Sequence, residues 1–402
     1  MYLTGEFPSY IDALFETISG FTTTGSSILS DVEALSRGTA FWRCFTHWIG
    51  GMGVLVFIMA VMPLSDSSSM HLMRAESPGP SVGKLVPKVK STAMILYGIY
   101  VVFTVIEIIA LLIAGMPLFD SMTLTFGTVG TGGFGLLNSS IASYSTAVQI
   151  IITVFMIICS INFTVYYMFL IKRPKEALMC EEMRYYLLIV FGSALLIAFN
   201  IRANFASFGK AFQQAIFQVA SVISTTGFAT ADFNLWPEFS RTILVLLMFV
   251  GACAGSTGGG IKVSRLIIMV KSVRNEIMSV THPRSVQKVH MDGRRIPDNV
   301  VKTVLCYLAG YVVILIVSVL LISLDNFDMT TNFTAVMATF NNVGPGLNRV
   351  GPTGNFGGFS VLSKLVLMFD MLVGRLELFP MLVIFAPGLW RIHPHRHVGK
   401  VQ

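Results

Sequence analysis

Long apolar stretches alternate with short polar segments along most of the chain. Six of them reach the length of about 20 helical residues that crosses the hydrocarbon core of a bilayer. They are residues 41–63, 91–114, 145–171, 185–201, 300–324 and 363–389. The pattern therefore predicts an all-α protein that crosses a membrane several times.

A seventh apolar stretch, residues 242–270, is interrupted by the sequence GACAGSTGGGIK from Gly251 to Lys262. Each glycine costs a helix about 1 kcal/mol relative to alanine, so we expect one helix to end here and another to begin after the interruption. Non-helical backbone at the depth of a membrane is tolerated only where it is buried in protein or lines a cavity. The interruption therefore predicts an intramembrane loop.

Four segments share a second pattern, a short amphipathic helix followed by a tetrapeptide that ends in glycine. They are residues 13–27, 121–135, 215–230 and 335–350, with final glycines Gly25, Gly132, Gly227 and Gly344. Two spanning helices separate successive copies, so the repeating unit is an outer helix, a re-entrant pore helix with its loop, and an inner helix. We expect four pseudo-symmetric repeats around one pore.

The expected repeats cover residues 1–63, 64–171, 172–290 and 291–402. The first holds only a pore helix, its loop and an inner helix, and a spanning outer helix is expected before it. The third contains the broken inner helix, and the fourth ends in a basic tail.

Composition and charge agree with a membrane protein. The chain is 54% hydrophobic and 12% charged, whereas soluble domains have about 25% charged residues. Most of the 28 Lys and Arg residues lie in loops 74–90, 172–184 and 265–302 and after residue 389. Because basic loops face the cytoplasm, the net charge of +7 reflects topology rather than binding to nucleic acid.

Motifs of soluble enzymes occur only as fragments. Residues 130–135 satisfy G-x-G-x-x-G, but no predicted strand precedes them and no acidic residue follows before Glu176. The sequence GSTGGGIK lacks the Gly-Lys pair of a phosphate-binding loop. The five cysteines are scattered and predict neither disulfides nor zinc. His393, His395 and His397 are better explained as part of a solvated basic tail than as metal ligands.

The glycine-terminated loops carry the candidate chemistry. A dehydrated cation can cross a bilayer only where oxygen atoms replace its water shell, and rings of backbone carbonyls do this. Glycine allows backbone angles that turn successive carbonyls inward, and the C-terminus of a pore helix favours cations. Carbonyl oxygens are hard ligands that suit alkali ions. Four such loops predict a carbonyl-lined pathway for a cation.

The four loops, GACAGSTGGGIK and GRLELFP (residues 374–380) together resemble the TrkH/TrkG/KtrB family of bacterial potassium uptake proteins, related to fungal Trk and plant HKT transporters. The likeness spans the whole chain. It implies K+ uptake by a multi-pass protein of the bacterial plasma membrane, with no enzymatic activity and no cofactor in this chain. It also implies a homodimer carrying a cytoplasmic RCK-type nucleotide-binding regulator similar to TrkA or KtrA.

The resemblance also implies the residues of a selectivity filter that would coordinate K+. These are Thr22, Thr23, Thr24 and Gly25; Val129, Gly130, Thr131 and Gly132; Ser224, Thr225, Thr226 and Gly227; and Asn341, Asn342, Val343 and Gly344. Glycine at all four final positions favours potassium over sodium.

A gate beneath the filter is implied in the same way. Its residues are Gly251, Gly255, Ser256, Thr257, Gly258, Gly259, Gly260, Lys262 and Arg375. A charge at mid-span is costly and points to function, with Glu377 or the loop carbonyls as the expected partner of Arg375. The alternative is a structural Arg375–Glu377 pair that joins helices.

Two other functions remain open from the sequence. One is an alternating-access carrier for a small solute, since such folds also use broken helices, although typically as two inverted halves. The other is a Na+-coupled K+ symporter. Whether Na+ or H+ is coupled, which regulator binds and how many copies assemble are not determined by the residues.

Overall fold

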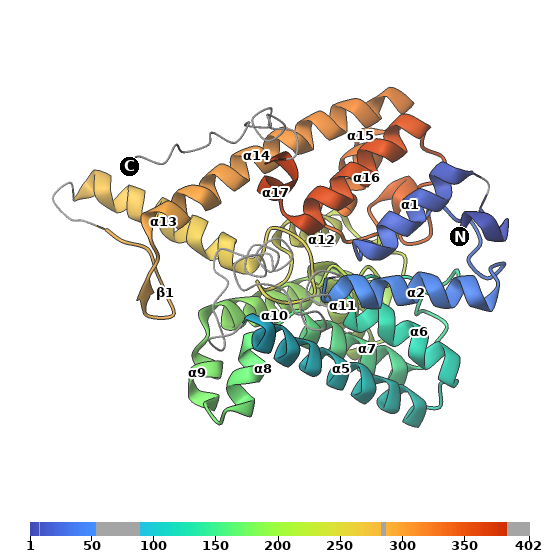
Figure 1. Cartoon of the computed structure of the whole chain (residues 1–402), viewed down its shortest axis with the longest axis horizontal. Helices are drawn as coiled ribbons and strands as arrows, with labels where there is room; N and C mark the ends of the chain where they lie inside the picture. Colours follow the sequence, from blue (N-terminus) through green and yellow to red (C-terminus); the bar gives the residue numbers. More distant parts are fainter. Residues whose placement is uncertain (8, 54–88, 283–286, 384–402) are drawn as a thin grey trace, which may run out of the picture.

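The computed structural model describes residues 1–7, 9–53, 89–282 and 287–383. This part of the chain is mostly helical (Figure 1). The α-helices are α1 (Tyr10–Phe21), α2 (Arg37–Gly51), α5 (Val89–Ile113), α6 (Leu118–Val129), α7 (Thr146–Cys159), α8 (Phe163–Leu170), α9 (Pro174–Met179), α10 (Glu181–Ile201), α11 (Phe208–Ile223), α12 (Glu238–Val250), α13 (Val263–Thr281), α14 (Asp298–Ile322), α15 (Met329–Phe340), α16 (Val361–Leu376) and α17 (Leu378–Val383).

The remaining elements are short. Five single-turn 3-10 helices are η1 (Tyr2–Thr4), η2 (Arg202–Asn204), η3 (Phe233–Leu235), η4 (Ser323–Asp325) and η5 (Asn348–Val350). In the described ranges, the only sheet is an antiparallel hairpin of β1 (His290–Met291) and β2 (Arg294–Arg295), with His290 opposite Arg295.

Three of the predicted spans are continuous helices. Ala93–Ile113, Glu181–Asn204 and Asp298–Asp325 are long and apolar enough to cross a membrane. They lie in α5, in α10 with η2, and in α14 with η4, and they confirm the spans predicted at 91–114, 185–201 and 300–324. Only 22–33% of the most apolar window of each span is buried inside the chain. Lipid therefore provides the apolar surroundings of these faces.

The stretch 145–171, predicted to be long enough to span, is two helices that together are long and apolar enough to cross a membrane but do not form one continuous helix. Helices α7 and α8 meet at 88° across a break at residues 160–162. The Asn162 side chain starts the second helix, because its Oδ1 accepts a hydrogen bond from Thr164 N at 2.8 Å. An apolar stretch of sufficient length does not reveal this local cap.

The span predicted at 363–389 is also broken. Helix α16 ends at Leu376, where the next residue, Glu377, has φ of 69°, and α17 begins at Leu378. In the stretch 41–63, α2 ends at Gly51. Residues 54–63, residues 384–389 and the tail histidines His393, His395 and His397 lie outside the described residues.

The predicted interruption of the seventh stretch is confirmed. Helix α12 ends at Val250 and α13 begins at Val263, so the non-helical segment runs from Gly251 to Lys262, as the sequence predicts. Gly251, Gly255 and Gly260 have φ between 68° and 78°, which glycine adopts without a steric penalty. We call residues 251–262 the intramembrane loop.

The helices close into a circuit around a common centre. Helix α1 packs on α2, and contacts then run in order through α6, α7, α11, α12, α15 and α16, which packs back on α1. The four short helices that precede the glycine loops, α1, α6, α11 and α15, alternate with α2, α7, α12 and α16. Figure 1 shows α1 (blue) beside α16 (red), although they are far apart in sequence. The circuit brings the ends of α1, α6, α11 and α15 together.

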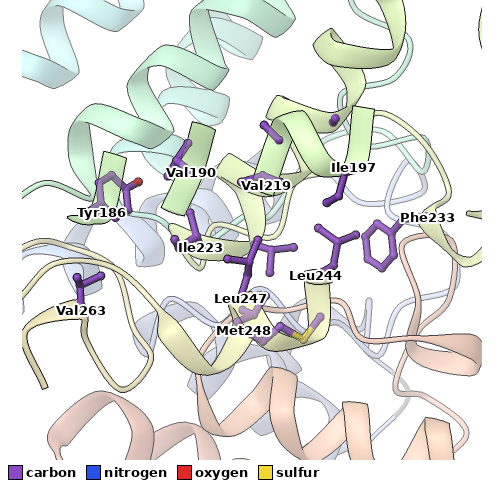
Figure 2. Close-up of a cluster of buried hydrophobic side chains, with 14 of the residues drawn as sticks. Tyr186, Val190, Ile197, Val219, Ile223, Phe233, Leu244, Leu247, Met248 and Val263 are labelled. Carbon is purple, nitrogen blue, oxygen red and sulfur yellow. The ribbon is translucent and has the colours of Figure 1, made fainter. Parts of the chain in front are cut away.

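A large apolar cluster packs α11 and α12 of this circuit against α10 (Figure 2). Tyr186, Val190 and Ile197 of α10 face Val219 and Ile223 of α11, while residues of α12 cover both helices. The α12 members are Leu244, Leu247 and Met248. Packing of this kind fixes the end of α11, and with it the loop that follows.

Candidate functional site

The four glycine loops have the same backbone conformation. In each loop two residues separated by one position have positive φ, and the residue between them donates its N–H to the carbonyl five residues earlier, over 2.8–2.9 Å. The positive-φ pairs are Thr23 and Gly25, Thr131 and Gly133, Thr225 and Gly227, and Asn342 and Gly344. The four segments are therefore conformationally equivalent, whatever their sequences.

This equivalence corrects the predicted register of the second loop by one residue. Gly133, with φ of 79°, stands where Gly25, Gly227 and Gly344 stand in the other loops, and Val129 is the last residue of α6. The second tetrapeptide is therefore Gly130–Thr131–Gly132–Gly133. Several adjacent glycines left the register ambiguous in the sequence. In the other three loops, the register predicted from the sequence agrees with the backbone, because the second and fourth residues of each tetrapeptide have positive φ.

Gly132 requires glycine for a different reason. A Cβ atom on this residue would lie 2.1 Å from the ring of His47, which is fully buried on α2. His47 Nδ1 is 2.9 Å from the Gly20 carbonyl oxygen, at the end of α1. His47 thus supports the second loop from behind, a role that the sequence pattern did not indicate.

The four final glycines close a ring of backbone contacts, which we call the glycine ring. A Cβ atom on Gly25, Gly133, Gly227 or Gly344 would lie 2.1, 1.8, 2.2 or 2.8 Å from a carbonyl oxygen of the next loop. These oxygens belong to Gly132, Thr226, Val343 and Thr24, respectively. Only glycine allows backbones to approach this closely. Each loop rests on the next, and the fourth rests on the first.

Strain accompanies the ring. Thr23, Thr131 and Thr225 are β-branched residues at φ of 53–60°, a region that is an outlier for such side chains. Each costs about 1–3 kcal/mol and persists only where its surroundings enforce it, as at functional sites. Asn342 tolerates this conformation better, and its Nδ2 donates to Thr24 Oγ1 and to the Met371 carbonyl, both at 2.9 Å.

A cavity of about 150 Å³ lies against one face of the glycine ring. All four ring glycines contribute to its lining, and Arg43 of α2 is its only basic lining residue among those described.

The N-terminal segment is attached to the start of α2 through Glu6, which lies outside the spans. Hydrogen bonds from Thr39 and Ser36 to the Glu6 carboxylate lower its pKa to about 2.

A buried ion pair supports the first loop. Arg43 Nη2 lies 2.6 Å from Glu16 Oε1, and both side chains are almost fully buried. Glu16 also accepts from Ser27 Oγ at 3.0 Å and from Ile28 N at 3.2 Å, directly after the loop. The arginine lies 3.9 Å above the ring of Phe134 in the second loop. Our sequence reasoning missed this pair; the signal was an acidic residue on the face of α1 that packs inward.

We expect Glu16→Gln to lower the melting temperature of the purified protein substantially. Removal of one member of a buried ion pair typically costs about 3–5 kcal/mol, because it leaves the other charge unpaired. The double variant Glu16→Gln/Arg43→Gln should be more stable than Glu16→Gln alone. Additive losses in this double-mutant cycle would show that the two charges are not coupled.

The intramembrane loop contacts the opposite end of the tetrapeptides. Gly259 N donates to Thr225 Oγ1 at 2.6 Å. A Cβ on Gly258 would lie 2.7 Å from the Ser224 carbonyl oxygen, and one on Gly259 would lie 2.5 Å from that of Asn341. The loop therefore packs directly against the first carbonyls of the third and fourth loops.

The other predicted gate residues hold the loop in place. Thr257 Oγ1 donates to the Cys159 carbonyl at 3.1 Å, and the Gly255 carbonyl accepts from Phe163 N at 3.0 Å, so the loop is attached to the break between α7 and α8. The backbones of Gly251 and Gly260 are in close contact, because a Cβ on Gly251 would lie 2.7 Å from Gly260 Cα. Ser256 Oγ donates to the Cys253 carbonyl at 2.6 Å, and Lys262 Nζ donates to the Gly258 carbonyl.

Arg375 joins the intramembrane loop to α2. Its Nη1 donates to the Thr257 carbonyl at 2.7 Å, and its Nη2 donates to the carbonyls of Gly50 and, at 2.7 Å, Gly51. The predicted partnership with loop carbonyls is thus present. Glu377, the other predicted partner, forms its salt bridge with Arg265 of α13 at 2.6 Å. Arg375 therefore connects three segments of the chain.

The helical circuit, the apolar spans and the buried loop define a polytopic membrane protein of the transport class. The family model for TrkH, described as a cation transport protein, matches residues 2–392, and the chain belongs to this family. This supports the interpretation of the chain as a transport protein rather than an enzyme.

Relatives and a solved structure agree with this family. The chain is 36% identical to the Trk system potassium uptake protein TrkH of Salmonella typhimurium over 388 residues, covering 94% of this chain and 79% of the relative. It is 32% identical to TrkG of Escherichia coli K12, covering 95% of this chain and 78% of that protein. The crystal structure of the potassium transporter TrkH from Vibrio parahaemolyticus matches with a TM-score of 0.84 at 33% identity, covering 95% of this chain and 80% of that one.

Proposed function

We propose that the chain takes K+ into the cell through a selectivity filter made by the four glycine loops. The relatives named above are potassium uptake proteins. The observation that carries the proposal is the closed glycine ring, in which four equivalent loops meet around one centre. In this proposal four repeats surround one pore, and carbonyls of the tetrapeptides replace the water shell of the ion.

The short helices would contribute to the field at the filter. Helices α1, α6, α11 and α15 end where the tetrapeptides begin, so the partial negative charge of each C-terminus lies near the proposed path. This favours cations over anions, while the close spacing of the carbonyls selects among cations. Glycine in all four ring positions supports potassium rather than sodium.

The intramembrane loop and Arg375 would form the gate of this pathway. The intramembrane loop packs against the first carbonyls of the third and fourth tetrapeptides. The guanidinium of Arg375 joins this loop to α2 by donating to the carbonyls of Thr257 and Gly51. The positive charge of Arg375 would also repel a cation leaving the filter. In this proposal, K+ passes when these hydrogen bonds break and the loop moves aside.

Ion flux into proteoliposomes that contain no other protein tests the proposed function. We expect Rb+ or K+ uptake that follows an imposed membrane potential and is not competed by small organic solutes. A strict requirement for a Na+ gradient would favour the Na+-coupled symporter. Uptake of an organic solute without K+ movement would favour an alternating-access carrier and would contradict the channel-like proposal.

We also propose that an RCK-type nucleotide-binding regulator, similar to TrkA or KtrA, docks on the cytoplasmic face of a homodimer of this chain. The exposed hairpin β1–β2 carries Arg294 and Arg295 near the start of α14 (Figure 1). The basic loop 74–90, which the sequence also indicated for docking, lies outside the described residues.

We expect Arg294→Glu/Arg295→Glu to abolish co-purification of the chain with this regulator, because the reversal places two acidic groups on the proposed docking surface. Lys172→Glu/Arg173→Glu is a matched control, since it reverses two basic residues in another exposed loop. Retention of the complex by the Arg294→Glu/Arg295→Glu variant would exclude the hairpin as the docking site.

A further inference from the structure

Helix α5 carries an acidic residue inside the membrane. The buried face of this helix includes Tyr100, Thr104, Glu107 and Leu111, which are spaced by three or four residues and so form one stripe. Glu107 is 0% exposed and lies within the span Ala93–Ile113. An ionisable side chain at this depth is costly and points to a function. The filter and gate proposed above do not use this residue.

Glu107 has no charged partner in the part of the chain that the structure describes. No salt bridge there includes it, and neither of its carboxyl oxygens accepts a hydrogen bond. A carboxylate that is buried without an opposite charge is strongly unfavourable. The surroundings of Glu107 therefore favour the neutral carboxylic acid, which is a hydrogen-bond donor.

The acceptor for this donor is on the neighbouring pore helix. Helix α5 packs on α6, and Thr128 of α6 lies within hydrogen-bonding reach of the Glu107 carboxyl group. The single proton of the Thr128 hydroxyl is donated to the Leu124 carbonyl at 2.9 Å. A hydroxyl oxygen also has two lone pairs, so Thr128 Oγ1 can still accept. The neutral acid matches this neighbour, whereas a carboxylate would not.

Thr128 lies in the last turn of α6, directly before the second glycine loop. Its carbonyl accepts from Thr131 N at 3.0 Å, and Thr131 has the strained φ of 55°. The adjacent Gly127 carbonyl accepts from Gly132 N at 2.8 Å. A strained backbone persists only where its surroundings enforce it. The last turn of α6 is part of those surroundings, so the position of Thr128 affects the second tetrapeptide.

The fourth loop has a similar polar contact with its own outer helix. Asn341, the first residue of the fourth tetrapeptide, donates from Nδ2 to Tyr311 Oη of α14 at 2.8 Å. Both side chains are buried. A polar side chain on an outer helix thus supports a glycine loop at a second place in the circuit.

We propose that Glu107, as the neutral acid, positions the second glycine loop by donating a hydrogen bond to Thr128 Oγ1. The inference rests on the proposed filter, because it concerns carbonyls that would bind K+. Glu107 does not touch the ion and is a positioning residue. A binding site is precise only where the residues behind it are held by packing and hydrogen bonds. Loss of this bond would leave the end of α6, and the carbonyls after it, less firmly placed.

Reversal potentials for K+ against Na+ in proteoliposomes, at equal amounts of folded protein, test this role. Glu107→Leu removes the donor and should lower the preference for K+ about threefold to tenfold, the range expected for one ordinary hydrogen bond. Glu107→Gln keeps a neutral donor of similar size and should retain the preference. A residue that only stabilises the fold would lower the melting temperature in Glu107→Leu without changing the preference.

Thr128→Val removes the acceptor and provides a second, independent variant. We expect the same loss of preference, and no further loss in Glu107→Leu/Thr128→Val, because the two side chains form one interaction. Thr123→Val is the matched control. Thr123 is buried on the same helix, but its hydroxyl donates to the Phe119 carbonyl of that helix at 2.8 Å, so its removal should leave the preference unchanged.

The outcomes separate this inference from the proposed filter. If the unmodified chain does not prefer K+, the filter fails and the role of Glu107 with it. If the unmodified chain prefers K+ and Thr128→Val does too, only the role of Glu107 is refuted, even where Glu107→Leu does not fold. Loss of preference in Glu107→Gln would assign the effect to a carboxylate charge and overturn the proposal, and so would additive losses in the double variant.

Discussion

Gly133→Ala is expected to reduce the preference for K+ over Na+ by about tenfold or more, in reversal potentials or competitive Rb+ uptake. A loss of about 1.4 kcal/mol in the free energy by which the filter binds K+ more tightly than Na+ is sufficient for a factor of ten. The new methyl group would lie 1.8 Å from the Thr226 carbonyl oxygen, and the residue has φ of 79°. The carbonyl must therefore move from the position in which it would bind the ion.

Gly25→Ser should raise sodium permeation for the same reason, since its side chain would meet the Gly132 carbonyl.

Gly132 provides the matched control for the register of the second loop. Gly132→Ala alone would collide with the ring of His47 at 2.1 Å, not with a carbonyl of another loop. The double variant Gly132→Ala/His47→Ala removes this collision, and we expect it to recover most of the ion preference. His47→Ala should not rescue Gly133→Ala. The opposite pattern of rescue would restore Gly132 to the ring and refute the register that we assign.

Arg375→Ala is expected to raise K+ flux by about tenfold to a hundredfold in proteoliposomes without a regulator, with ion preference nearly unchanged. Hydrogen bonds to a charged group contribute about 1.5–3 kcal/mol each, and the guanidinium donates to carbonyls on both the intramembrane loop and α2. Their loss favours the state in which the loop is displaced. Deletion of Ser256 to Gly259 should act in the same direction, because it removes the segment that packs on the tetrapeptides.

Two further variants determine whether Arg375 acts through the loop. Arg375→Lys keeps the charge but cannot hold several carbonyls in one plane, so we expect an intermediate flux. Glu377→Gln breaks the salt bridge to Arg265 and tests the alternative, a purely structural ion pair. Reduced flux through well-folded Arg375→Ala, at equal amounts of protein, would disprove the gate.

Much of the architecture was predictable because membrane insertion imposes simple rules on sequence. The continuous spans follow from hydrophobic length, and the interruption from Gly251 to Lys262 follows from the cost of five glycines in one helix. Breaks that depend on one residue were not predicted. Asn162 and Glu377 interrupt apolar stretches through a side-chain cap and a left-handed backbone, which hydrophobicity does not report.

The candidate site was also predictable from the sequence only in part. By itself, the sequence determined a multi-pass helical protein with four glycine-terminated loops and a glycine-rich intramembrane loop, because helix length, periodicity and glycine content are local properties. Only the tertiary structure decided that Gly133 rather than Gly132 completes the glycine ring, that Arg375 binds carbonyls of Thr257 and Gly51, and that Glu377 pairs with Arg265. These contacts join residues that are distant in sequence, and the closed helical circuit sets their distances.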